Sequence, residues 1–318
     1  MNSTPKVSVM VVAYNQAHFI RDTLDSILAQ DYDNLEIVVA DDASTDGTQD
    51  IAREYAAKYP DKFVLVLSER NHGITANCNA CFFACTGELI ATFSGDDLFL
   101  PGKIRAQVQE FVRDPEVVFC YHPVEVFDSS TDTTLYVTFQ NPREVIRGVE
   151  EIIVGGGVPG GCSVMVRRSA CPPDGFDVRL PTVSDWLFQI EVALKGKVAK
   201  VDQVYGKYRK HRQGTTQRVH EFLNETLRTL DLIVEKHPDR PELVALCRKG
   251  KARYLAGEAF RQLTRNIATA CKLSRQAVEL DPANVRYRVL YLISRFQVLA
   301  RIMGPMLNSG KYLIKRYM

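Results

Sequence analysis

The chain has 318 residues, 46% hydrophobic and 25% charged, a composition typical of a globular protein with one large core or two domains. Forty basic residues stand against 38 acidic ones, so no overall field favours a nucleic acid partner. The eight cysteines do not form the dense framework of a small secreted domain, which predicts reduced thiols in a cytosolic protein.

The first part of the chain alternates strand-like and helix-like patterns. Apolar β-branched runs at 6–14, 35–40 and 63–67 indicate buried strands, and helical periodicity at 19–30 and 49–59 indicates helices between them. Short connections between such elements favour parallel pairing with right-handed crossovers. The sequence therefore predicts an α/β fold with a mostly parallel central sheet flanked by helices.

A cysteine-bearing helix after Gly73 stops near Gly87, and the run 88–97 reads as a further strand that ends in Gly95, Asp96 and Asp97. Two adjacent carboxylates repel each other, and burying either one unpaired costs several kcal/mol. Carboxylates at a strand end suit Mg²⁺ or Mn²⁺. The simpler alternative is an ordinary polar turn.

Polar residues follow three of the predicted strands. Tyr14 and Asn15 follow the first, Asp42 closes the second, and Asp96 and Asp97 end the strand at 88–97. In open α/β sheets, ligands bind outside the carboxyl ends of the strands. These side chains are therefore expected to meet in one crevice.

The middle of the chain gives mixed signals. A helix is expected from 101 to 111, a strand from 117 to 121 and a loop from 128 to 142. The glycine-rich run 155–161 contains a G-x-G-x-x-G spacing, but it precedes a strand-like run instead of following one. We therefore reject a dinucleotide site and expect a loop that can reshape around a ligand.

Asp185 lies at the start of an apolar helix that runs to residue 194, where a carboxylate is stabilised by unpaired amides. A helix-terminal charge and a catalytic acid are both consistent with that position. A strand-like run at 198–205 leads to a basic loop at 208–212. From 219 onward the pattern is helical, so a domain boundary is expected near Arg218, separating 1–217 from 218–318.

With these motifs laid out, the first 217 residues resemble a family-2 glycosyltransferase of the Rossmann-like GT-A fold. The resemblance rests on ordered short motifs: Tyr14-Asn15, Ser26 to Gln30, Asp41 to Thr48, Asn71 to Gly73, Asn79, Gly87-Glu88, Ser94 to Asp97, Gly175 to Asp177, Ser184 to Trp186 and Tyr208 to His211. It does not extend to the all-helical C-terminal region.

The resemblance implies roles for particular residues. Asp185 matches the catalytic base, and Asp97 and His211 match positions that bind Mg²⁺ or Mn²⁺. The remaining matches are to nucleotide-binding positions, at Ala13, Tyr14, Asn15, Asp42, Asn79 and Asp96, and to diphosphate-binding positions, at Arg209 and Lys210. Ser94 and Cys78 depart from the family pattern, where many relatives have an acid and an arginine respectively.

The implied reaction is an inverting transfer of a sugar from a nucleotide-diphosphate sugar, with a UDP-sugar favoured. The expected acceptor is a hydroxyl group of a lipid-linked glycan in bacterial surface polysaccharide assembly. A sugar hydroxyl is a poor nucleophile, so a carboxylate must take its proton while a cation offsets charge on the leaving diphosphate. A non-catalytic scaffold or a module that binds sugar nucleotides without turnover is the alternative.

The end of the chain is strongly basic. No acidic residue follows Asp281, whereas seven basic residues do. The apolar residues Val289, Leu292, Ile293, Phe296, Leu299, Ala300 and Met303 are expected on one helix face, apart from the arginines. Such a helix lies on anionic membranes, although a helix packed on the domain would have the same pattern. With no signal peptide at the N-terminus, we expect a cytoplasmic protein bound peripherally to the inner face of the membrane.

Overall fold

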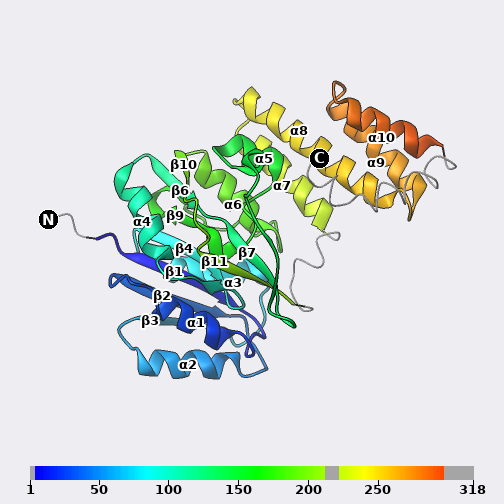
Figure 1. Ribbon diagram of the computed structural model, residues 1–318. Coiled ribbons are helices and arrows are strands. Elements are labelled where there is room, and N and C mark those ends of the chain that lie inside the picture. The colour runs from blue at the N-terminus through cyan, green and yellow to red at the C-terminus, as the bar shows by residue number, and fades with distance from the viewer. Residues whose placement is uncertain (1–3, 212–221, 297–318) are drawn as a thin grey trace. The chain divides into compact units, whose positions relative to one another are not determined.

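The chain folds into two units, and the computed structural model describes residues 4–211 and 222–296 (Figure 1). The first unit comprises Met1–Ile152 and Gly156–Gln217, and the second comprises Ile153–Gly155 and Arg218–Met318. The boundary expected near Arg218 lies outside the described residues, so the two-domain assignment stays a prediction. Each unit is described by itself below.

A seven-stranded sheet forms the centre of the first unit, in the order β10-β6-β9-β4-β1-β2-β3. The pairs β4-β1, β1-β2 and β2-β3 are parallel, and β9 is antiparallel to both of its neighbours. The strands are β1 Val7–Ala13, β2 Leu35–Asp41, β3 Phe63–Leu67, β4 Leu89–Ser94, β6 Val117–Tyr121, β9 Met165–Arg167 and β10 Lys197–Lys200. The predicted α/β class with a mostly parallel central sheet is confirmed.

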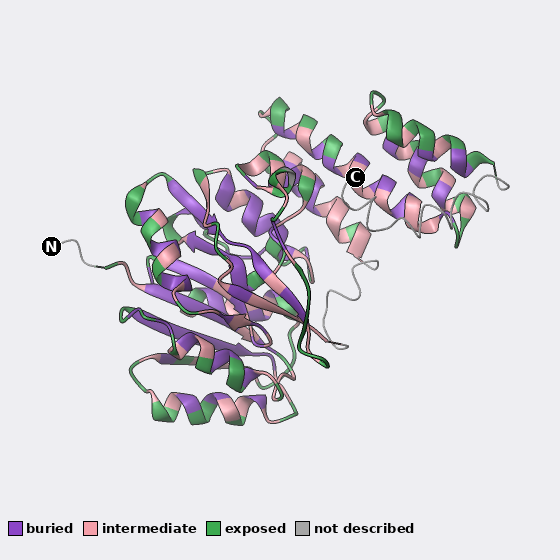
Figure 2. Ribbon diagram, viewed as in Figure 1, coloured by how far each residue is buried: buried purple, intermediate pink, exposed green. Residues whose placement is uncertain are grey.

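Helices flank this sheet because its strands are apolar on both faces. Every residue of β2 is buried, and Figure 2 shows the central strands as an almost continuous buried band. The helices of this unit are α1 Ile20–Leu28, α2 Thr48–Lys58, α3 Ile74–Ala84, α4 Lys103–Arg113 and α6 Ser184–Ala193. A further helix, α5 Val149–Gly155, begins in this unit, and its last three residues belong to the second. Short 3-10 turns lie at η1 Pro142–Glu144, η2 Gly161–Ser163 and η3 Arg168–Ala170.

A second sheet of four strands, in the order β5-β11-β7-β8, differs from the sequence-based expectation. Its strands are β5 Leu98–Phe99, β7 Val124–Asp128, β8 Thr133–Val137 and β11 Gly206–Lys210. The expected loop at 128–142 thus contains β8, and the expected basic loop at 208–212 begins as β11. Both are polar strands whose pairing partners, not their own apolar pattern, hold them in place.

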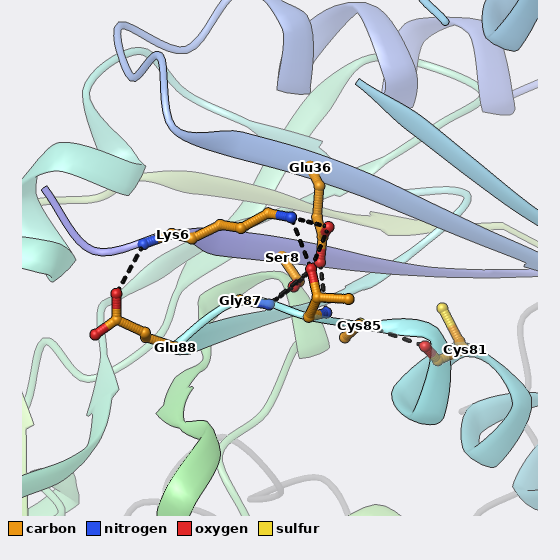
Figure 3. A network of polar contacts seen from close by, with 8 residues as sticks. Lys6, Ser8, Glu36, Cys81, Cys85, Gly87 and Glu88 are labelled. Carbon is orange, nitrogen blue, oxygen red and sulfur yellow. Dashed lines mark hydrogen bonds and ion pairs between the residues drawn. The ribbon is translucent and has the colours of Figure 1, made fainter. Parts of the chain in front are cut away.

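Glu36, in β2, connects the start of β1 to the residues that precede β4 (Figure 3). Its carboxylate accepts hydrogen bonds from the Ser8 hydroxyl and from the amide and hydroxyl of Thr86, at 2.6 and 2.7 Å. The Lys6 ammonium lies 2.5 Å away. Burial alone would raise the pKa of Glu36, but these partners outweigh it and lower that pKa to about 2.

The second unit is helical, as predicted, with α7 Leu223–Lys236, α8 Pro241–Gln262, α9 Ile267–Leu280 and α10 Val285–Arg295. Small residues Ala259, Ala270 and Ala277 are fully buried in its core with Leu290 and Ile293. Ile293 therefore lies on the packed face of α10, not on the exposed stripe where the sequence suggested it. None of the described helices is long and apolar enough to cross a membrane.

Candidate active site

The carboxyl ends of β4, β1 and β2 lie side by side, so three loops leave the same edge of the sheet. Ala13 is paired with Asp41, and Val12 with Ser94. The Asp42 amide donates to the Ala13 carbonyl at 3.2 Å, and the Gly95 amide donates to the Val12 carbonyl at 3.0 Å. The backbone therefore brings the ends of these three strands together, as the strand pattern predicted.

Asp42 links the end of β2 to the start of α3. Its carboxylate accepts hydrogen bonds from the amides of His72 and Gly73, both at 2.8 Å. Asn77, one turn into α3, donates through its side-chain amide to the carbonyls of Ala13 and Ala40 at 3.1 and 3.2 Å. Sequence reasoning missed Asn77, although a buried amide within an apolar helix is a signal that backbone groups need partners there.

Asp185 follows Ser184, which contacts the first turn of α3. The neighbouring Ser184 hydroxyl lies 2.8 Å from the Thr75 hydroxyl, which also donates to the Leu180 carbonyl at 2.6 Å. Asp185 itself is exposed, and its carboxylate accepts a hydrogen bond from the Trp186 amide at 2.9 Å. Desolvation by the surrounding protein raises the pKa of Asp185 despite that exposure.

Asp96 and Asp97 are neighbours in sequence but have different surroundings. Asp97 is fully buried, and its Oδ1 accepts a hydrogen bond from the Arg209 amide at 2.9 Å. Burial, and then the adjacent Asp96 carboxylate, raise the pKa of Asp97. Asp96 is only half-buried, and its Oδ2 lies 2.9 Å from Nε2 of His211. The carboxylate that reaches solvent at this turn is therefore that of Asp96.

Arg209 stabilises the Asp96–Asp97 turn through a hydrogen bond to its backbone. Its side chain is only 10% exposed, and its Nε donates to the Asp96 carbonyl at 2.7 Å. The guanidinium carbon also lies 4.8 and 5.0 Å from the rings of Phe19 and Phe127. Arg209 is thus held against the protein and braces the Asp96–Asp97 turn, and the adjacent Lys210 lies with its ammonium 4.8 Å from the Tyr208 ring.

The side chains of Asn79 and Asn15, two more of the predicted site residues, form hydrogen bonds with backbone groups. Asn79 donates to the Phe176 carbonyl at 2.8 Å and accepts from the Phe176 amide at 2.7 Å, so both ends of its amide hold one loop. Asn15 accepts from the Thr45 amide at 3.0 Å, while its own amide donates to the Ser44 hydroxyl. Tyr14, by contrast, is 49% exposed at the end of β1.

The pair Asp96 and His211 fits a divalent cation that is shared with a substrate. Carboxylate oxygen and imidazole nitrogen are both common ligands of such ions, and they lie together here. Among residues 4–211 and 222–296, no group of three or more acidic, histidine or cysteine side chains could hold a metal ion. Mg²⁺ typically binds through one or two carboxylates together with substrate phosphates and water.

With this geometry in view, comparison with known proteins gives the family. A model described as glycosyl transferase family 2 matches residues 8–171, which is more than half of the chain. The chain belongs to glycosyltransferase family 2. The resemblance drawn from the motifs is therefore confirmed.

Two relatives have similar sequences over part of the chain. An uncharacterized protein of Mycobacterium tuberculosis is 32% identical over 211 residues, which cover 65% of this chain and 60% of that protein. EpsE of Bacillus subtilis, named a putative glycosyltransferase, is 44% identical over 108 residues, or 34% of this chain and 39% of EpsE. The chain thus matches less than two thirds of the length of each of these relatives.

Solved structures confirm the fold. Residues 1–349 of S. aureus TarS superpose with a TM-score of 0.65 at 16% identity, covering 96% of this chain and 92% of that chain. A mannosyltransferase from Pyrobaculum calidifontis, solved with GDP-Man and Mn²⁺, gives a TM-score of 0.59 at 20% identity, covering 95% and 88%. At these identities the similarity establishes the architecture of this family-2 chain and leaves its substrates to be argued separately.

Proposed function

We propose that this chain is an inverting glycosyltransferase that moves a sugar from a nucleotide-diphosphate sugar to a hydroxyl group of a glycan or lipid-linked acceptor. Two observations support the proposal, one for each kind of polar group that the reaction needs. The Asp96–His211 pair offers ligands for a cation, and Asp185, joined to α3 through Ser184 and Thr75, offers a carboxylate open to solvent.

Asp185 would act as the general base. The attacking hydroxyl must lose a proton as the new glycosidic bond forms at the anomeric carbon and the bond to the diphosphate breaks. A single displacement of this kind inverts the anomeric centre and needs no nucleophile from the protein. The desolvation that raises the pKa of Asp185 makes its carboxylate a stronger base than an ordinary exposed aspartate.

Asp96 and His211 would hold Mg²⁺ or Mn²⁺ against the donor diphosphate. The cation, when bound, would offset negative charge on the departing nucleoside diphosphate. This proposal divides the two acids differently from the sequence-based expectation, which gave Asp97 to the metal and Asp96 to the nucleotide. Asp97 is buried and bonded to the Arg209 amide, so we propose that it holds β11 and with it His211 in place.

Three other assignments change for the same physical reason. Arg209 is packed between aromatic rings and bonded to the Asp96 carbonyl, so we propose that it braces the turn and that Lys210 alone faces the diphosphate. Asn79 and Asn15 use their side-chain amides on the backbone, which supports a structural role for both. Ala13, Tyr14 and Asp42 remain the proposed nucleotide-binding positions.

A UDP-sugar is the proposed donor. TarS has been solved with UDP-GlcNAc and with UDP, whereas the archaeal mannosyltransferase was solved with GDP-Man and Mn²⁺. Both kinds of donor therefore belong in a direct test. Donors that bind the folded protein stabilise it by mass action, by about 2.7 kcal/mol at a hundred times the dissociation constant.

The experiment screens UDP- and GDP-sugars for thermal stabilisation of the protein with and without Mn²⁺, and then follows release of nucleoside diphosphate. We expect one sugar nucleotide to stabilise the protein only with the cation and to turn over. Asp185→Asn should keep this binding and lower turnover by about 10²–10⁴-fold. Asp174→Asn, an exposed acid in the preceding loop, is the matched control and should behave as the unmodified chain.

Metal-dependent binding without turnover, in the presence of a broad set of acceptors, would instead favour the non-catalytic binding module. Full activity of Asp185→Asn would contradict the base assignment. Stabilisation that is independent of the cation would contradict the metal role of Asp96 and His211.

We also propose that the second unit contacts an anionic membrane surface. Val285, Val289 and Leu292 are 48–65% exposed, and their spacing of four and three residues places them on one face of α10. Phe296, the residue directly after the helix, is 55% exposed. Exposed arginines at 288 and 295 border this stripe, and α10 contains no acidic residue. An apolar stripe bordered by basic groups suits the interface of an anionic bilayer, and such contact would bring the enzyme to lipid-linked acceptors.

A further inference from the structure

Five buried polar atoms lie beneath the Asp96–Asp97 turn without a hydrogen-bond partner among the described residues. They are Asp97 Oδ2, Lys103 Nζ, Gln107 Oε1, His122 Nε2 and Ser163 Oγ, here called the Lys103 cluster. All five residues are less than 1% exposed. Native proteins rarely leave buried polar atoms unpaired, because each one costs about 1–3 kcal/mol.

The members of this cluster come from neighbouring elements. Gln107 on α4 donates to the carbonyl of Cys120 on β6 at 3.1 Å and to that of Ser163 in η2 at 2.9 Å. A methyl group on Gly206 would lie 3.3 Å from both Cys162 Sγ and His122 Cε1, so those two side chains are adjacent. Cys162 and His122 therefore both lie next to Gly206, the first residue of β11.

Cys162 also connects the two charged members. Its thiol lies close enough to the Asp97 carboxylate and to the Lys103 ammonium for both charges to affect its pKa, which burial raises first of all. Lys103 similarly affects the pKa of His122, which desolvation lowers to about 3. The Lys103 ammonium sits 3.9 Å from the centre of the Phe99 ring, directly after the turn.

The unpaired atoms are complementary in hydrogen bonding. The Lys103 ammonium has three N–H donors, and the Ser163 hydroxyl can donate or accept. The Asp97 and Gln107 oxygens are acceptors. None of them lies within hydrogen-bond distance of another. A buried water normally makes two to four hydrogen bonds to groups of this kind.

We propose that the Lys103 cluster binds ordered water that links Lys103 Nζ to Asp97 Oδ2, and that Lys103 is thereby a positioning residue for the Asp96–Asp97 turn. Asp97 holds the Arg209 amide at the end of β11, and the same strand leads to His211. Lys103 would therefore act on the metal ligands through Asp97 without touching the substrate. This positioning role rests on the proposed metal site, whereas the water site does not.

A crystal structure of the full chain tests the water site directly. We expect density for at least one water within hydrogen-bond distance of Lys103 Nζ and of Asp97 Oδ2 or Gln107 Oε1. Protein atoms filling this region, with no such density, would overturn the proposal.

Ser163→Ala gives a second test that does not depend on catalysis. If the Ser163 hydroxyl binds water, its removal should lower the melting temperature by about 2–4 °C, the shift typical of one lost hydrogen bond in a chain of this size. If the hydroxyl is unpaired, removing it should leave the melting temperature unchanged or raise it. That second result would contradict the water site.

Lys103→Met tests the positioning role, because methionine is of similar length and uncharged. We expect the dissociation constant for a nucleotide, measured by calorimetry with Mn²⁺, to rise about tenfold. Val108→Ala, five residues along α4 with an apolar side chain that is 6% exposed, should destabilise the fold without changing that constant.

Equal nucleotide affinity in Lys103→Met, Val108→Ala and the unmodified chain would overturn the positioning role. If the unmodified chain binds nucleotide without needing Mn²⁺, the proposed metal site fails instead, and the crystallographic water and the Ser163→Ala result still stand on their own. If Lys103→Met does not fold, the water density and the Ser163→Ala melting temperature decide the question.

Discussion

Two adjacent aspartates show how burial separates residues that look equivalent in sequence. Asp97 is enclosed and bonded to the Arg209 amide, whereas Asp96 reaches solvent beside His211. Asp97→Ala should lower the free energy of unfolding by about 1–3 kcal/mol, because it leaves a buried amide unpaired. Asp96→Ala should change stability little and abolish Mn²⁺-dependent nucleotide binding.

Denaturant unfolding and calorimetry on both variants check this division. The reverse pattern, with Asp96→Ala unstable and Asp97→Ala defective only in metal-dependent binding, would show that Asp97 is the ligand.

The raised pKa of Asp185 sets the acidic limb of the pH dependence. The base must be ionised to take a proton, so turnover should fall as pH decreases through the raised pKa, above the ordinary value of 3.8. The measurement is kcat against pH for the unmodified chain and Asp185→Glu. A limb that is the same in both variants would assign the titration to another group.

Residue positions at the strand ends followed from the sequence, but their partners did not. Parallel strands place their carboxyl ends together, which located Asp42 and Asp96 correctly. The bonds of Asn79 to Phe176 and of Arg209 to Asp97 join residues 97 and 112 positions apart. No local pattern encodes such contacts, so the sequence alone could not show that Asn79 and the Arg209 amide are hydrogen-bonded within the protein.

At the scale of elements, Glu36 ties β1 and β2 to the residues before β4. Its pKa is about 2 in the folded protein against 4.5 as a free side chain. The ionised form therefore stabilises the fold fully above pH 4.5, by at most about 3 kcal/mol, and this contribution is lost as pH falls toward 2.

Glu36→Gln should remove most of that pH dependence and destabilise the protein at neutral pH. Unfolding free energies at pH 7 and pH 3 test this, with Glu54→Gln, an exposed acid on α2, as the control. Equal loss of stability between the two pH values in Glu36→Gln and in the unmodified chain would contradict the role of the Glu36 carboxylate.

The strands of the large sheet were predictable because their apolar runs are dictated by burial on both faces. β8 and β11 were not, because their residues are half-buried or exposed and alternate weakly. β11 forms through its parallel pairing with β7 and its antiparallel pairing with β5. The formation of β11 thus depends on its partner strands more than on its own sequence. This is the strand that contains Arg209 and leads to His211.

At the scale of the molecule, the exposed stripe of α10 predicts binding to anionic vesicles. The full chain should sediment with vesicles containing phosphatidylglycerol and not with phosphatidylcholine alone, and high salt should weaken the binding. Leu292→Ser should reduce partitioning about tenfold through lost apolar burial. Val112→Ser, an equally exposed apolar residue on α4, is the control. Equal sedimentation of both variants would contradict the assigned surface.

The helical nature of the second unit was predictable from periodicity, but the orientation of α10 was not. Ile293 and Leu292 are adjacent in sequence, and the fold buries the first and exposes the second. The rest of the expected stripe, Leu299, Ala300 and Met303, lies outside the described residues.

The most direct test of the central claim is the anomalous signal of Mn²⁺ in crystals grown with UDP. The proposed site predicts a Mn²⁺ ion coordinated by the Asp96 carboxylate and the His211 imidazole, with the UDP diphosphate completing its shell. An ion bound by Asp97 instead, or UDP and Mn²⁺ on another surface of the chain, would contradict it.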